Sequence, residues 1–143
     1  MGRYDNAHFG IDDENVVSTW ATPVPYHEIP EDYFTYDFAG GDHDPWNRFS
    51  SDFGFGYYDD DFVENYFDEP EKCSLPVREL IAPLSYSSSF IDAVVQRAKE
   101  LGLEETSYLF LIYNFKYDPT ITRKQKSAIF QFLGTFLFNE DEI

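Results

Sequence analysis

The sequence predicts a single α+β domain in which helices pack on one face of a small antiparallel β-sheet of about three strands. Three observations favour this class. A β-branched and aromatic run lies at Val16–Trp20, an apolar stripe with helical spacing extends over residues 90–101, and two strand-like segments follow at 108–117 and 128–138. A chain of 143 residues fits one domain that can bury about 68% of its unfolded surface.

The first half of the chain is expected to open with a strand. Residues 1–14 show no apolar periodicity and are expected to be frayed, so the domain should span residues 15–143. The first strand ends before Pro23. Residues 30–38 begin with Pro-Glu-Asp, as helices do, but they contain four Tyr and Phe residues, so helix and strand are equally favoured there. Residues 40–45 are expected to form a loop.

Two helices are expected. The first is short and amphipathic and covers residues 59–67, where one stripe holds the apolar side chains Phe62, Val63, Tyr66 and Phe67. Asp59–Asp61 stand at its N-terminus, where carboxylates accept main-chain N–H groups and meet the positive end of the helix dipole. The second, longer helix covers residues 90–101, with Ser87–Ser89 as candidate N-caps and Gly102 after its last turn.

The last forty residues change to the period of a strand. Residues 108–117 are apolar on both faces and then alternate, as in a central strand that runs toward an edge. Asp118-Pro119 turns the chain, and residues 128–138 are expected to place four phenylalanines on one face, namely Phe130, Phe132, Phe136 and Phe138. The two strands should pair as an antiparallel C-terminal hairpin. These phenylalanines, like Trp20 in the first strand, are expected to belong mostly to the core.

The charge of the chain is concentrated in its first half. The whole chain has a formal net charge of −17. Residues 1–71 contain 18 acidic and 2 basic residues, a net charge of −16, whereas residues 72–143 have a net charge of −1. A small domain needs a net charge of only about 2–8 for solubility, and a larger one destabilises the fold by self-repulsion. The excess therefore indicates electrostatic capture of a cationic partner and argues against binding to nucleic acid or anionic membranes.

The sequence also favours a cytoplasmic location. The single cysteine, Cys73, cannot form an internal disulfide, and no charged-then-apolar leader opens the chain. No apolar run reaches the length of about 18 residues that a bilayer-spanning helix needs.

Catalytic and metal-binding patterns are scarce, so no enzymatic activity, cofactor or small-molecule substrate is expected. Residues 52–54, Asp-Phe-Gly, match the magnesium-binding tripeptide of protein kinases, but the chain has no glycine-rich nucleotide loop and no catalytic-loop motif. His8, His27 and His43 lack the spacing of a zinc helix, and Cys73 has no CxxC partner.

Acidic side chains are the candidate partner-binding residues, and six are selected: Asp42, Asp44, Asp59, Asp60, Asp61 and Glu64. One cap and one first-turn neighbour suffice at a helix N-terminus, so part of this set should remain as surplus surface charge. The run 59–64 lacks the alternating ligands and the glycine of a calcium loop. Helix capping and a solvated face are therefore favoured over metal binding or acid–base catalysis.

Five segments of the chain combine into a recognisable pattern: Val17–Trp20, Phe49–Glu64, Leu84–Ile91, Leu111–Tyr117 and Phe132–Phe136. In this pattern the chain resembles the immunity protein 22 family over roughly Asn15–Phe138. The resemblance implies a small cytosolic α+β protein of a bacterial polymorphic toxin system that neutralises a neighbouring toxin by binding. The chain departs from the pattern at Thr22, where a glycine is expected, and in a proline-rich stretch that replaces the following helix.

The resemblance and the charge together imply an immunity protein that occludes the C-terminal domain of a cognate toxin. That toxin is expected to be basic and a nuclease, since nucleases present cationic substrate grooves. Two alternatives remain: an acidic nucleic-acid mimic that inhibits DNA- or RNA-binding proteins in general, and a small carboxylate-based hydrolase. Binding to many basic proteins would favour the mimic, and measurable turnover would favour the hydrolase.

Overall fold

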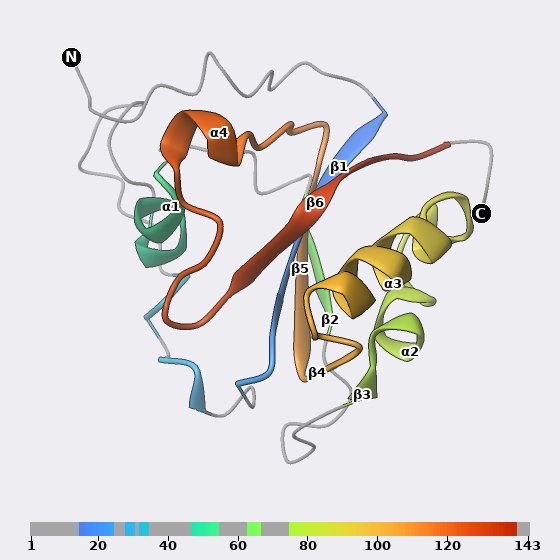
Figure 1. Ribbon diagram of the computed structural model, residues 1–143, viewed down its shortest axis with the longest axis horizontal. Coiled ribbons are helices and arrows are strands. Elements are labelled where there is room, and N and C mark those ends of the chain that lie inside the picture. Colours follow the sequence, from blue (N-terminus) through green and yellow to red (C-terminus); the bar gives the residue numbers. More distant parts are fainter. Residues whose placement is uncertain are drawn as a thin grey trace.

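The computed structural model describes residues 15–24, 28–30, 32–34, 47–54, 63–66 and 75–139. Figure 1 shows how their elements are arranged. In chain order these elements are β1 (Val16–Thr22), α1 (Arg48–Phe53), β2 (Val63–Tyr66), β3 (Leu75–Pro76), α2 (Val77–Ile81), η4 (Ser87–Ser89), α3 (Ile91–Glu100), β4 (Glu105–Thr106), β5 (Tyr108–Tyr113), α4 (Pro119–Thr122) and β6 (Gln131–Leu137). The predicted α+β class and the first strand are confirmed, and the division between residues 1–14 and 15–143 stays a prediction.

The main sheet has four antiparallel strands in the order β2-β5-β1-β6. Strand β1 therefore lies between β5 and β6, and the predicted pairing of the last two strands in a hairpin is wrong. The connection over residues 114–130 contains α4 and is too long for a tight turn. It leaves room for β1 to pair with β5 on one side and with β6 on the other (Figure 1).

Each face of the sheet is covered by its own hydrophobic cluster. Helices α2 and α3 share one face and bury Leu80 and Val94 against Leu109 and Leu111 of β5. The short α1 covers the opposite face with Phe49 and other aromatic side chains (Figure 1). The expectation that helices pack on one face of a sheet of about three strands is therefore wrong in both details, because the described sheet has four strands and helices on both faces. Burial on both faces explains why β5 is apolar at every position.

Trp20 lies at the centre of the cluster beneath α1, and its predicted core position is confirmed. The side chain is fully buried. Its ring centroid lies 5.1–6.4 Å from the ring centroids of five aromatic residues, which come from α1, β5, β6 and the segment after β5: Phe49, Phe53, Phe110, Tyr117 and Phe132. Distances of this kind are typical of favourable tilted and edge-to-face aromatic contacts.

A β-bulge in β6 changes which face its phenylalanines occupy. The register with β1 shifts between Thr19, which pairs with Gly134, and Trp20, which pairs with Phe132, so Leu133 is the extra residue. Phe130 and Phe132 pack beneath α1, whereas Phe136 and Phe138 pack with α2 and α3. The expectation that all four lie on one face is therefore wrong, because one inserted residue reverses the alternation.

The helix predicted over residues 59–67 is not formed at the positions that the structure describes. Val63–Tyr66 is instead the edge strand β2, with Val63 opposite Ile112 and Tyr66 opposite Leu109. A nine-residue pattern is too short to separate helix from strand. An isolated helix of that length is marginal, whereas the open edge of β5 offers main-chain partners.

Helix α3 is confirmed, but its N-cap is not a serine. Ser87–Ser89 form the short 3-10 helix η4, and Phe90 takes the N-cap position without a side-chain hydrogen bond. Gly102 follows the helix with a φ of +75°, as expected for a C-terminal glycine. Of residues 30–38, the described residues 32–34 form a turn.

Candidate partner-binding surface

The structure describes one of the six candidate residues. Asp42, Asp44, Asp59, Asp60 and Asp61 lie outside the described residues, and their role in partner binding stays a prediction. Glu64 lies on β2, an edge strand of the main sheet, and is half-buried.

Glu64 accepts hydrogen bonds within the protein, and its role in partner binding stays a prediction. Both oxygens of its carboxylate accept the main-chain N–H of Ser85 at 3.2 Å. The carbonyl oxygen of Ser85 in turn accepts the hydroxyl of Tyr113 at 2.7 Å. These bonds tie β2 and β5 to the loop that follows α2. They give Glu64 a structural role, whether or not it also contacts a partner.

The hydroxyl of Tyr113 serves as a permanent donor in this network. Burial raises the pKa of Tyr113 far above its usual value, and the nearby negative charge of Glu64 raises this pKa further. The phenol therefore stays neutral throughout the physiological range. Its hydroxyl therefore keeps the proton that it donates to the carbonyl oxygen of Ser85.

A second polar cluster surrounds α1, on the opposite face of the sheet. The hydroxyl of Tyr33 donates to Asp52 at 2.7 Å, and the guanidinium carbon of Arg48 lies 5.5 Å from the centroid of the Tyr33 ring. Arg48 also pairs with Asp32 at 3.4 Å. Gly54 ends the helix with a φ of +80°. The Asp-Phe-Gly tripeptide thus ends a helix and accepts a hydrogen bond from a tyrosine.

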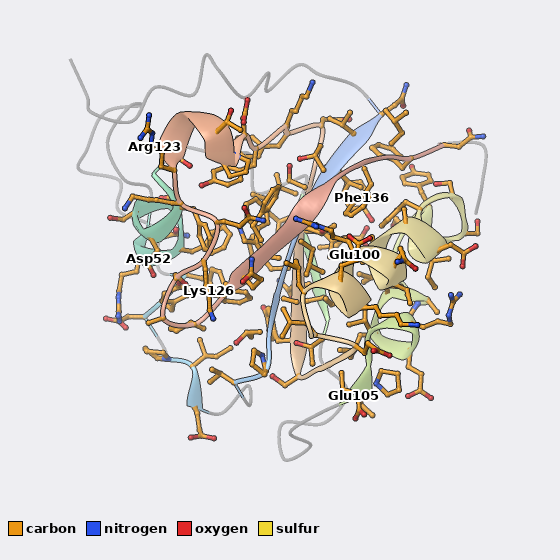
Figure 2. All side chains as sticks on the ribbon, in the orientation of Figure 1. Asp52, Glu100, Glu105, Arg123, Lys126 and Phe136 are labelled. Atoms are coloured by element: carbon orange, nitrogen blue, oxygen red, sulfur yellow. The ribbon has the colours of Figure 1, made fainter. Side chains whose placement is uncertain are left out.

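Sequence reasoning did not single out a group of exposed cations around α4. Four of the ten basic residues fall within residues 116–126: Lys116, Arg123, Lys124 and Lys126. All four are exposed, and the structure gives none of them an ion pair within the described part of the chain. Figure 2 shows Arg123 and Lys126 on the side of the molecule that carries α1 and α4. Their close spacing along the chain is the signal that could have identified them.

The described residues contain no group of three or more histidine, cysteine, aspartate or glutamate residues able to hold a metal ion. The same part of the chain contains no helix that is both long and apolar enough to cross a bilayer.

The chain belongs to the immunity protein 22 family, whose model matches residues 17–139. No curated protein and no solved structure matches the chain. Family membership gives this protein an immunity function in general and implies that it binds a partner toxin.

Proposed function

We propose that this protein is a non-enzymatic inhibitor that binds the C-terminal domain of a cognate nuclease toxin in the cytoplasm and occludes it. Family membership supports a toxin as the binding partner. The acidic charge of the chain supports a cationic toxin, as a nuclease would be. A nuclease binds a polyanion and therefore presents a cationic groove. An acidic protein can replace the phosphates there with its carboxylates.

The concentration of charge in residues 1–71 is the observation that carries this proposal. A net charge of −16 over half the chain creates a field that attracts a cationic surface before contact. Electrostatic steering raises association rates from about 10⁵–10⁶ to as much as about 10⁸–10⁹ M⁻¹s⁻¹ at low salt. A fast association rate protects the producing cell, because each toxin molecule is captured before it meets nucleic acid.

The bonds of Glu64 refine the proposed contact surface. Asp42, Asp44 and Asp59–Asp61 remain the proposed contact residues. Glu64 lies on β2, which begins two positions after Asp61, and it ties this strand to Ser85. Its substitution is therefore expected to affect stability, and the charge test should leave it unchanged.

Co-expression with the toxin domain encoded beside this protein tests the function itself. We expect the toxin to lose its toxicity and to co-purify with this protein in low salt. If neither occurs, the proposal is wrong. Capture of a panel of unrelated DNA- and RNA-binding proteins with similar affinity would instead favour the nucleic-acid mimic, for which the net charge is the supporting observation.

Matched charge variants test the contact surface. One variant carries Asp42→Asn, Asp44→Asn and Asp61→Asn, and the control carries Glu79→Gln, Glu100→Gln and Glu104→Gln. Each changes the net charge by three, but the control residues are exposed positions of the weakly charged half.

Stopped-flow association with the toxin domain should be slower for the first variant than for the control. The difference should shrink as salt shortens the Debye length from about 10 Å at 0.1 M to about 3 Å at 1 M. Equal association rates for the two variants at low salt would show that the acidic half has no local role in capture.

A further inference from the structure

Strand β6 is an edge strand, and its register with β1 shows which of its main-chain N–H and C=O groups point away from the sheet. The N–H of Phe138 donates to the carbonyl oxygen of Asn15, and the carbonyl oxygen of Val16 accepts the N–H of Asn114, on the β5 side. Along an antiparallel pair, the main-chain N–H and C=O of one residue face the neighbouring strand and those of the next residue face away from it. The register Ser18–Thr135 and Val16–Leu137 therefore directs the N–H and C=O of Thr135 and Leu137 away from β1.

The first half of this edge is closed by the protein itself. The N–H of Phe132 donates to the carbonyl oxygen of Gln125 at 2.8 Å, and the side-chain amide of Gln131 donates to the carbonyl oxygen of Phe132 at 3.1 Å. At the bulge, Nε of Arg97 donates to the carbonyl oxygen of Leu133 at 3.1 Å. Natural proteins cover sheet edges in such ways to prevent unwanted pairing.

The second half of the edge is left open. Within the described part of the chain, the structure gives the outward main-chain groups of Thr135 and Leu137 no hydrogen-bond partner. The Leu137 side chain is 76% exposed, and it is the only exposed large hydrophobic side chain among the described residues. Two donors and two acceptors at alternate residues, beside one apolar side chain, are what an added strand requires.

This open segment is also held in an extended shape. The hydroxyl of Thr135 lies 3.0 Å from the Ser18 hydroxyl, and the N–H of Asn139 donates to the Ser89 hydroxyl at 2.9 Å. The bond from Phe138 to Asn15 lies between them. A strand that is already fixed loses little conformational entropy when a partner pairs with it.

We propose that an extended segment of the toxin domain adds to this sheet as a fifth strand along Thr135–Leu137. This inference rests on the proposed function and names the surface through which it acts. A second copy of this chain is a poor occupant, since two proteins of net charge −17 repel each other. A cationic segment suits the edge, because the sequence continues directly after Asn139 with Glu140, Asp141 and Glu142.

Amide hydrogen exchange in the full-length protein, followed by NMR with and without the toxin domain, tests the proposal directly. In the free protein the amides of Thr135 and Leu137 should exchange quickly, whereas that of Phe136, which faces β1, should be protected. In the complex, the exchange of Thr135 and Leu137 should slow by at least about tenfold. A complex in which both amides still exchange quickly would overturn the proposed surface and leave the proposed function intact. Absence of any complex would refute both.

A substitution at Leu137 provides a second test. Leu137→Pro removes an outward N–H that makes no bond to β1, and proline is tolerated on edge strands. Its matched control, Leu137→Ala, keeps the N–H and removes most of the exposed side chain. We expect the proline variant to keep its melting temperature and to weaken the Kd for the toxin domain by at least about tenfold relative to the alanine variant.

Equal affinities of the two variants would overturn the role of main-chain pairing. If the proline variant fails to fold, the exchange measurement on the unaltered protein still decides the question. Self-association of the free protein at micromolar concentration that Leu137→Pro abolishes would assign the edge to a second copy instead, contrary to the proposal.

Discussion

Gly134→Ala tests whether the bulge in β6 depends on glycine. Gly134 has a φ of +152°, a region that residues with a side chain rarely adopt, and forcing such a residue there costs about 1–3 kcal/mol. A Cβ atom at this position would also lie 3.0 Å from Cζ of Phe136, so the ring would have to move. We therefore expect the substitution to lower the free energy of unfolding by about 2–4 kcal/mol. For a chain of this size that corresponds to a fall in melting temperature of roughly 6–16 °C.

Gly102→Ala is the matched control. Gly102 also has a positive φ, +75°, but a Cβ there would have no neighbour within 4 Å. Its substitution should cost about 1 kcal/mol, the backbone contribution alone. Urea denaturation of both variants measures the difference. If Gly134→Ala destabilises the protein no more than Gly102→Ala does, the close approach of Phe136 and the bulge geometry do not constrain β6 as argued.

Three further predictions concern the candidate surface and the core. Glu64→Ala should lower the free energy of unfolding by about 1 kcal/mol, because the N–H of Ser85 loses its carboxylate acceptor, and Glu64→Gln should cost less; urea denaturation that finds both variants as stable as the parent would refute this role. Burial raises the pKa of Tyr33, Tyr113 and Tyr117 above the usual value of about 10. The resulting stabilisation is complete below pH 10 and is lost as the pH rises above it, so unfolding followed by circular dichroism should show stability falling there, and a flat profile from pH 9 to 12 would contradict it. A chelator should leave the melting temperature within a few degrees, and a larger fall in calorimetry would reveal a metal that the sequence does not predict.

Local elements were predictable because their determinants are local. The β-branched run that forms β1 and the apolar stripe of α3 each encode one period within a few residues. Trp20 could be assigned to the core for the same reason, since it stands inside an apolar strand.

The acidic character of the first half could be read from the sequence, whereas the contacts that its side chains make could not. The acidic first half is a property of composition, and it indicated a cationic partner without any coordinates. The bond between Glu64 and Ser85 joins residues 21 positions apart, and no short pattern encodes it. The same limit applies to the open edge of β6, because an edge exists only once the neighbours of a strand are known.

The sequence by itself determined the α+β class, the family and the acidic charge of the first half of the chain, because periodicity, motifs and ionisable groups are carried by the chain in any conformation. Only the tertiary structure decided that residues 63–66 form a strand, that β1 separates β5 from β6, and that Leu133 is the extra residue of a bulge. Each of these outcomes depends on main-chain groups that find their partners in segments far away along the chain. The free energy that selects them comes from satisfying buried N–H and C=O groups and filling both faces of one sheet, and neither can be evaluated from a single segment.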